Sequence, residues 1–100
     1  MKVVALATLK RFWERNPDSE AALRSWYDEV RHAVWDTPHD IRQRYASASF
    51  VANNRVVFNI KGNSYRLIVA VGYRFQVVYI KFIGTHAEYD RIDADTVEFP

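Results

Sequence analysis

The sequence predicts an α+β fold in which helices come first and an antiparallel β-sheet follows. Through about residue 44, apolar residues recur every three or four positions, which is typical of helices with one buried side. From Arg55 onward the pattern alternates, and Val, Ile, Phe and Tyr dominate, as in β-strands. Gly62-Asn63 interrupts this region with a pair that favours a two-residue type II′ hairpin turn. Together these observations indicate helices packed on a small meander of consecutive strands.

The first 34 residues are expected to form a short strand and two helices. The opening strand should comprise Val3, Val4 and Leu6. A helix over Leu9–Arg15 should end before Pro17, because the residue preceding a proline avoids the helical region. Asp18 or Ser19 can cap the second helix, which should run to about Val34. Its buried stripe would consist of Leu23, Trp26, Val30, Ala33 and Val34, and the three tryptophans, Trp13, Trp26 and Trp35, are expected in the core.

Two capping boxes mark further helix starts. Thr-Pro-His-Asp at residues 37–40 should open a helix that ends near Arg44, followed by a loop through Asn54. Thr-His-Ala-Glu at residues 85–88 should open a short helix that carries His86 and Tyr89. The tail from Asp93 to Pro100 is expected either to be irregular or to add an edge strand.

Three strands are predicted, over Arg55–Lys61, Ser64–Gly72 and Phe75–Ile83. Alternation sorts the side chains of each strand onto two faces. The face toward the helices should carry Val56, Phe58, Ile60, Tyr65, Leu67, Val69, Val71, Val78, Ile80 and Phe82. The opposite face, called the second face below, should carry Asn59, Lys61, Arg66, Tyr79 and Lys81, together with Arg55, Val57, Ser64, Ile68, Ala70, Val77 and Ile83.

The two hairpin turns set the register across the second face. A turn at Gly62-Asn63 pairs Asn59 with Arg66, and a turn centred on Tyr73-Arg74 would pair Arg66 with Lys81. Like charges directly opposite in a sheet destabilise it. Such an arrangement indicates an anion site, and phosphate is the natural ligand because Arg binds it in a bidentate manner.

The charge distribution agrees with an anionic partner, although the net charge of the 100 residues is only +2. Residues 1–40 carry a net charge of −1, residues 41–84 carry +7 with no Asp or Glu, and residues 85–100 carry −4. Such a stretch attracts polyanions. The alternative is a solvated basic surface that the acidic tail neutralises by folding back. In that case, removing residues 93–98 should tighten binding to RNA, most visibly at low salt.

Length and composition limit the remaining possibilities. One hundred residues correspond to a single domain, and the absence of cysteine excludes a disulfide framework and a thiol nucleophile. No apolar run is long enough for a membrane span and the start is unlike a signal peptide, so a cytoplasmic location and no membrane association are expected. His32 and His39 lack companions at metal-ligand spacing, so neither a metal nor another cofactor is expected.

His86 and Tyr89 should lie at the rim of the second face, since their helix follows the third strand of the meander directly. With the cations they would suffice for metal-independent cleavage of RNA: one group takes the proton of a ribose 2′-OH, another protonates the leaving 5′ oxygen, and the cations stabilise the phosphorane. The alternatives are that His86 is an ordinary first-turn residue and that Tyr89 packs the helix on the sheet.

Two long stretches resemble the HigB toxin family. Residues 57–67 read VFNIKGNSYRL, which is similar to the family's FNI-x-GN-x-YRL core, and residues 79–90 read YIKFIGTHAEYD, which is similar to its ending. The resemblance implies a RelE-like fold with two helices on a small antiparallel sheet to which the opening strand is added. It also implies an mRNA interferase, the toxin of a bacterial toxin–antitoxin pair, which usually cuts mRNA in the ribosomal A site.

The resemblance further implies partners and site residues. A HigA-like antitoxin with a helix-turn-helix domain would inhibit the toxin, and operator DNA would be bound only through their complex. The catalytic residues would be Arg66, Lys81, His86 and Tyr89. Asn59, Lys61 and Tyr79 are expected to contact RNA. Two other functions fit the same residues: a non-catalytic sheet module that binds RNA, and a protein-interaction domain whose basic face docks an acidic segment.

Overall fold

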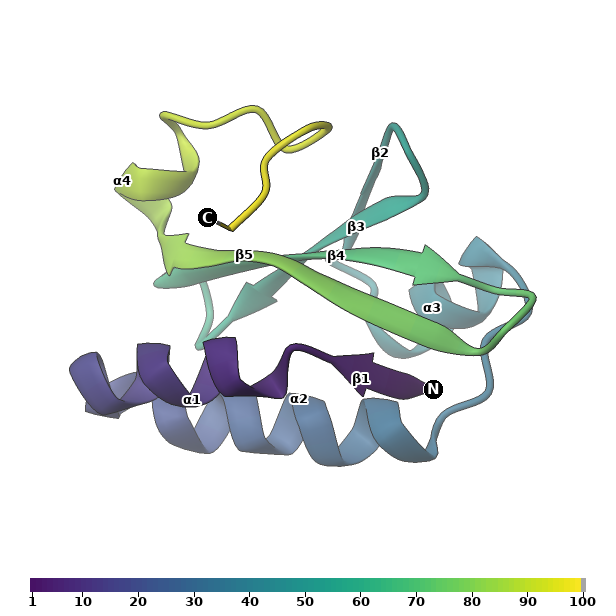
Figure 1. Cartoon of the computed structure of the whole chain (residues 1–100), viewed down its shortest axis with the longest axis horizontal. Coiled ribbons are helices and arrows are strands. Elements are labelled where there is room, and N and C mark those ends of the chain that lie inside the picture. Colours follow the sequence, from purple (N-terminus) through teal and green to yellow (C-terminus); the bar gives the residue numbers. More distant parts are fainter. Residues whose placement is uncertain (100) are drawn as a thin grey trace.

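The computed structural model describes residues 1–99 and has an α+β architecture, as predicted (Figure 1). Its elements are β1 (Lys2–Val4), α1 (Leu6–Arg15), η1 (Pro17–Ser19), α2 (Glu20–His32), α3 (Pro38–Arg44), β2 (Ser49–Val51), β3 (Arg55–Ile60), β4 (Tyr65–Gly72), β5 (Val77–Thr85) and α4 (His86–Tyr89). The strands form one sheet in the order β1-β5-β4-β3-β2. Strand β2 pairs with β3, β3 with β4 and β4 with β5, all antiparallel. Strand β1 joins β5 in parallel, so the sheet is mixed. Helices α1 and α2 lie side by side beneath one face of this sheet (Figure 1).

The N-terminal elements differ from the prediction at two boundaries. Leu6 is the first residue of α1 rather than part of a strand, because Ala5 adopts a left-handed conformation (φ 75°) that ends β1 abruptly. Helix α2 ends at His32, and Val34 is 71% exposed instead of completing the buried stripe. Extended backbone at Ala33 (ψ 152°) turns the chain away from the helix before Val34 is reached.

The region between α2 and β3 contains a strand that the sequence analysis assigned to a loop. Both predicted capping boxes are present, at Thr37 for α3 and at Thr85 for α4. After α3, β2 pairs with β3 through a hairpin in which Asn53 and Asn54 have positive φ angles of 64° and 57°. Asparagine tolerates this conformation better than most residues, so the Asn-Asn pair is the local sequence signal for this turn.

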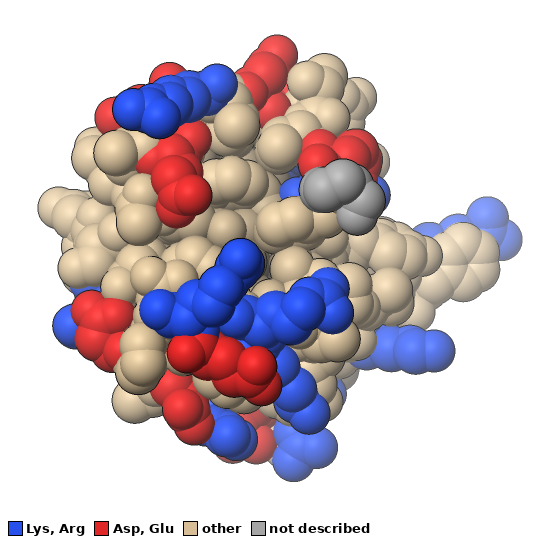
Figure 2. All heavy atoms as spheres, turned by 60° about the vertical axis from the view of Figure 1, so that its left-hand side comes forward, with Lys and Arg blue, Asp and Glu red and all other residues tan. Residues whose placement is uncertain are grey.

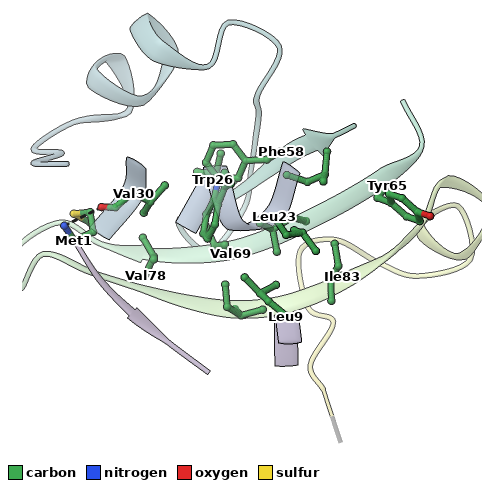
Figure 3. Close-up of a cluster of buried hydrophobic side chains, with 14 of the residues drawn as sticks. Met1, Leu9, Leu23, Trp26, Val30, Phe58, Tyr65, Val69, Val78 and Ile83 are labelled. Carbon is green, nitrogen blue, oxygen red and sulfur yellow. Dashed lines mark hydrogen bonds between the residues drawn. The ribbon is translucent and has the colours of Figure 1, made fainter. Parts of the chain in front are cut away.

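The main core lies between the helices and the sheet (Figure 3). In that view Leu9 of α1 and Leu23, Trp26 and Val30 of α2 face Val69 and Val78 of the sheet. The three tryptophans are all buried, as predicted, with exposed fractions of 3–6%. The helix-facing sets of β3 and β4 are also confirmed, since all seven predicted residues of those two strands belong to this core.

The pairing of β4 with β5 departs from the predicted register. The connection is four residues long, from Tyr73 to Gln76, and is centred one residue beyond the predicted turn. A β-bulge then adds one more residue to β5: Ile68 pairs with Phe82, but its neighbour Val69 pairs with Ile80. As a result Arg66 faces Gly84, and the predicted pairing of Arg66 with Lys81 is wrong.

The bulge also exchanges the faces of two large side chains. Lys81 is the extra residue, and beyond it the alternation of β5 is reversed. Phe82, which was predicted to face the helices, lies on the second face, while Ile83 joins the helix-side core. A single inserted residue therefore determines which aromatic and aliphatic groups line the candidate site.

The C-terminal segment covers part of the second face. Val57, Ile68 and Phe82 form a small buried cluster, and Tyr89, Ile92, Ala94 and Val97 pack against it. The described part of the tail, up to residue 99, contains turns but no strand, so of the two possibilities the edge strand is wrong; Pro100 lies outside the described residues. Within residues 1–99 no helix combines the length and apolarity that crossing a bilayer would demand.

Candidate active site

The second face is organised in three rows that run across β3, β4 and β5. The Arg55 row consists of Arg55, Ala70 and Tyr79; the apolar row of Val57, Ile68 and Phe82; and the Arg66 row of Asn59, Arg66 and Gly84. Successive rows are two residues apart on β3 and β4, which is about 7 Å along a strand, while the bulge puts Tyr79 and Phe82 three residues apart on β5. The tail lies over the apolar row, so the polar groups on its two sides form separate environments.

The Arg66 row contains the pairing of Asn59 with Arg66 that the sequence predicts. The short hairpin that sets this register has Gly62 at φ 61° and a hydrogen bond from Ser64 N to Lys61 O (3.1 Å). The guanidinium of Arg66 donates from Nη1 to two backbone carbonyl oxygens, those of Asn63 (3.1 Å) and Tyr65 (3.2 Å). It therefore retains donors for a ligand.

This guanidinium contacts an aromatic ring but, within residues 1–99, pairs with no carboxylate. Its Cζ lies 5.9 Å from the centre of the Tyr89 ring, within the range of a cation–π contact. Among residues 1–99 it has no carboxylate within ion-pairing distance. Gly84, which faces it, contributes no side chain, and a Cβ there would lie only 2.6 Å from Cζ of Phe82. The row is thus kept free of bulk beside Arg66.

Helix α4 brings His86 and Tyr89 to the end of the Arg66 row. Its capping box is closed by hydrogen bonds from Glu88 N to Thr85 Oγ1 (3.1 Å) and from Thr85 N to Glu88 Oε1 (2.8 Å). The side chain of His86 is 56% exposed, with Nε2 3.7 Å from a carboxylate oxygen of Asp90. Tyr89 is half-buried because it also packs against the apolar row. The alternative that Tyr89 packs the helix on the sheet is therefore correct, and the same ring also contacts Arg66.

Lys81 lies on the other side of the apolar row, away from the place expected for it. Its ammonium forms an ion pair with Glu98 (3.0 Å) and lies 5.8 Å from the ring of Tyr79, which is 42% exposed. Glu98 also accepts a hydrogen bond from Nη2 of Arg55 (2.8 Å). The Lys81 hydrogen bond, followed by the charges of Lys81 and Arg55, holds the pKa of Glu98 below its ordinary value despite partial desolvation.

Arg55 anchors the tail and was not singled out in the sequence. Its side chain is 6% exposed, and Nη1 donates to the carbonyl oxygens of Ala94 (3.3 Å) and Val97 (2.6 Å). Nothing in the local pattern of β3 distinguishes a buried arginine from an exposed one, because its partners lie about 40 residues later. The sequence does contain one indication of this contact: residues 41–84 have no acid of their own, whereas the tail is acidic.

Lys61 is directed toward the helix layer instead of the second face, which corrects another expectation. Strand β3 ends at Ile60, and the positive φ of Lys61 (52°) breaks the alternation on which the prediction rested. Its ammonium binds Asp18 of η1 (2.9 Å), and the same carboxylate accepts a hydrogen bond from the hydroxyl of Tyr65 (2.5 Å). The Tyr65 and Lys61 hydrogen bonds lower the pKa of Asp18, and the Asp18 bond raises that of Tyr65.

Acidic side chains from outside residues 41–84 offset much of the positive charge of that stretch. Within residues 1–99 the ion pairs that do so are Arg44–Glu29, Arg55–Glu98, Lys61–Asp18 and Lys81–Glu98. Figure 2, which brings the α4 end of the molecule forward, shows cationic and anionic side chains intermingled rather than a uniform basic surface. The alternative of neutralisation by the acidic tail is therefore correct for Arg55 and Lys81, which pair with Glu98, whereas Arg44 and Lys61 pair with acids of the N-terminal helices and Arg66 pairs with none within residues 1–99. The arrangement is suited to holding an anion, such as a phosphate, beside Arg66, Tyr89 and His86.

Comparison with known proteins agrees with this geometry. A family model described as HigB_toxin, the RelE-like toxic component of a toxin–antitoxin system, matches residues 19–92. The chain is 26% identical over 94 residues to the mRNA interferase HigB of Escherichia coli O6:H1, covering 92% of this chain and 91% of that protein. It is 25% identical over 92 residues to the mRNA interferase toxin HigB of Escherichia coli K12 and to the mRNA interferase HigB of Shigella flexneri, covering 90% of this chain and 88% of each relative. Because the family model spans well over half of the sequence and both quoted motifs fall within it, the chain belongs to the HigB family of RelE-like toxins.

Proposed function

We propose that this toxin is an mRNA interferase, an endoribonuclease that cleaves mRNA while it is being translated. The names of its relatives support this activity. The observation that carries the proposal is the Arg66 guanidinium, which keeps free donors on the sheet and contacts the phenol ring of Tyr89 in α4, the helix that also carries His86. Residues 1–100 would act as one toxin domain in the cytoplasm, where translated mRNA is found.

The proposed reaction needs no metal ion, because the chain supplies both the charge and the proton-transfer groups. The ribose 2′ oxygen attacks the adjacent phosphorus as its proton passes to a base. The bond from phosphorus to the 5′ oxygen then breaks, and an acid protonates that oxygen. The products are a 2′,3′-cyclic phosphate and a 5′-hydroxyl end. His86 and Tyr89 are the two groups placed for these proton transfers, and imidazole is the side chain best suited to them near neutral pH.

Arg66 would bind the scissile phosphate and stabilise the charge that builds on it in the transition state. Asn59, its cross-strand partner, would orient the ribose or the base. Lys81 begins about 10 Å along β5 from Gly84, so it would act on the adjacent phosphate rather than directly opposite Arg66. Tyr79 would stack on a base, and Lys61 would contact RNA at the outer end of the β3–β4 hairpin, in competition with Asp18.

We also propose that the substrate is presented by the ribosome and that a HigA-like helix-turn-helix antitoxin inhibits the toxin. Membership of a toxin–antitoxin family supports an antitoxin partner. An inhibitor that covers the Arg66 row needs charge opposite to that of the row, so an acidic segment of the antitoxin is the expected contact. Operator DNA would be reached only through the antitoxin.

The test is inducible expression in bacteria of the chain, Arg66→Ala and Arg11→Ala, followed by mapping of mRNA 5′ ends. Arg11 is an exposed arginine on α1, so its replacement removes the same charge without touching the second face. We expect growth arrest and new in-frame 5′ ends within translated regions for the unaltered chain and Arg11→Ala, and loss of both for Arg66→Ala. Normal growth without new ends for the unaltered chain would contradict the proposal.

Purified protein separates an enzyme from a module that only binds RNA. His86→Ala and Tyr89→Phe should each reduce mRNA cleavage by about 10²-fold or more, the usual contribution of a proton-transfer group, while RNA affinity changes little. Cleavage that requires added ribosomes would support the ribosome-dependent form. Equal cleavage of free mRNA would restrict the proposal to an endoribonuclease. RNA binding without any cleavage would favour the non-catalytic module.

A further inference from the structure

Three aromatic–cation pairs follow one another along the β4–β5 hairpin and α4. They are Arg66 with Tyr89 (5.9 Å), Lys81 with Tyr79 (5.8 Å) and Arg74 with Phe75 (5.5 Å), measured from the charged group to the ring centre. The first pair lies at the candidate active site, and the second lies by the Arg55 row, on the other side of the apolar row. The third lies at the hairpin turn, which is at the opposite end of β5 from α4 (Figure 1).

The outermost pair has no role in the fold. Phe75 is 78% exposed, the largest exposed fraction among the large apolar side chains of residues 1–99, and belongs to neither buried cluster. Arg74 is exposed and forms no ion pair within the described residues. The turn beneath them is held independently by Gln76, whose side chain binds the carbonyl oxygens of Trp35 (2.8 Å) and Tyr73 (2.8 Å). An exposed ring on a rigid support, next to an unneutralised guanidinium, suits a ligand that offers a flat surface and negative charge.

We propose that Arg74 and Phe75 form a base-stacking subsite for single-stranded RNA, remote from the position of cleavage. This inference rests on the proposed function, because it takes the RNA at the Arg66 row as its starting point. From there the strand would cross over the tail segment that covers the apolar row and continue past Lys81 and Tyr79 to the hairpin tip. The path from Gly84 to Tyr79 is about 16 Å at the usual rise of a strand, and the tip lies beyond it. Phosphates would contact Lys81 and Arg74, and bases would stack on Tyr79 and Phe75.

Charge favours RNA over a protein segment as the occupant. Residues 41–84 contain no Asp or Glu, so the hairpin itself carries no carboxylate, and Glu98 of the tail, which pairs with Lys81 and Arg55, would have to be displaced from Lys81 by a phosphate. An aromatic ring paired with an arginine can stack on any of the bases, because each base has a π face. Val34, 71% exposed in the adjoining α2–α3 connection, supplies no such face and provides a matched apolar control.

The experiment measures binding of the full chain to uncleavable 2′-O-methyl RNA of roughly 4 and roughly 12 nucleotides, lengths that bracket common single-strand site sizes. Phe75→Ala should weaken binding of the longer RNA by about 5- to 150-fold, the usual loss for one stacked base, and leave the shorter RNA unaffected. Phe75→Trp should restore affinity, and Val34→Ala should have no effect. Arg74→Ala should make the plot of log affinity for the longer RNA against log salt concentration less steep by about 0.7. This is the change expected for the loss of one single-strand phosphate contact.

The outcomes distinguish this inference from the function on which it depends. Unchanged affinity of Phe75→Ala for the longer RNA, in a protein that still binds and cleaves RNA, overturns the subsite alone. Equal weakening by Phe75→Ala and Val34→Ala overturns it in favour of a general apolar contact. Unchanged RNA affinity together with loss of antitoxin binding in Phe75→Ala overturns it in favour of a protein-docking site. Absence of RNA binding by the unaltered chain overturns both proposals.

Discussion

Replacing Glu98 with glutamine should raise the affinity of the toxin for RNA, and the increase should depend on salt. The Glu98 carboxylate lies 2.8 Å from a guanidinium nitrogen of Arg55 and 3.0 Å from the ammonium of Lys81. Its negative charge therefore occupies the position that an RNA phosphate would take beside Lys81. Glutamine has nearly the same shape and can still accept a hydrogen bond from Arg55, but it leaves the ammonium free to bind RNA.

The magnitude follows from counterion release. One additional phosphate contact on a single strand steepens the log–log salt dependence by about 0.7. Across a fourfold range, from about 50 to about 200 mM salt, this corresponds to a factor of roughly 2.6. We therefore compare the ratio of the RNA affinity of Glu98→Gln to that of the unaltered chain. This ratio should be about two- to threefold larger at about 50 mM than at about 200 mM salt. Because the pKa of Glu98 is lowered, the carboxylate is ionised at any neutral assay pH.

The assay is fluorescence anisotropy with uncleavable RNA at several salt concentrations, with thermal unfolding as a check on the fold. Asp93→Asn is the matched control, since it removes the same charge from the same tail but from a side chain that, among residues 1–99, accepts a hydrogen bond only from the backbone N–H of Asp95 (2.9 Å). Parallel salt dependences for Glu98→Gln and the unaltered chain would refute the reasoning. An equal effect of Asp93→Asn would show that net charge alone is responsible.

Two further predictions concern stability. Phe58→Ala should lower the free energy of unfolding by about 3–5 kcal/mol in urea titrations, because the ring is 1% exposed and contacts the rings of Trp26 and Tyr45 at 5.5 and 5.0 Å; a loss below about 1 kcal/mol would contradict this packing. Asp18→Asn should destabilise the chain at neutral pH, but the difference from the unaltered chain should shrink under acid conditions. The folded-state pKa of Asp18 is lowered by Tyr65 and Lys61, so its contribution is present above the unfolded value and disappears as pH falls through the folded one. If the urea midpoints of Asp18→Asn and the unaltered chain differ by the same amount from neutral pH to about pH 2, this role of Asp18 is contradicted.

Local signals in the sequence were sufficient for most of the fold. Capping boxes, the Pro17 break and strand alternation depend on neighbouring residues, and they located six elements to within a few positions. The pairing of Asn59 with Arg66 followed from one tight turn. Leu6, Val34 and β2 were misplaced because each depends on a single backbone conformation, at Ala5, Ala33 or the Asn53-Asn54 pair.

The candidate site was less predictable because its geometry depends on a bulge and on distant partners. No local pattern announces an extra residue at Lys81, yet that residue moves Lys81 away from Arg66 and brings Phe82 to the second face. Likewise, Lys61 and Arg55 acquire their partners from segments about 40 residues away. The charge count of the segments predicted that such partners were needed but could not specify which pairs would form.

The parallel pairing of β1 with β5 bears on when the chain can fold during its own synthesis. Lys2–Val4 leave the ribosome first but pair with residues 77–79, and contacts this distant in sequence form late. Until β5 and α4 emerge, α1 and α2 have only part of a sheet to cover, and Arg66 lacks its strand partner Gly84 and its aromatic neighbour Tyr89. A nascent chain therefore has no assembled candidate site until both β5 and α4 have emerged from the ribosome.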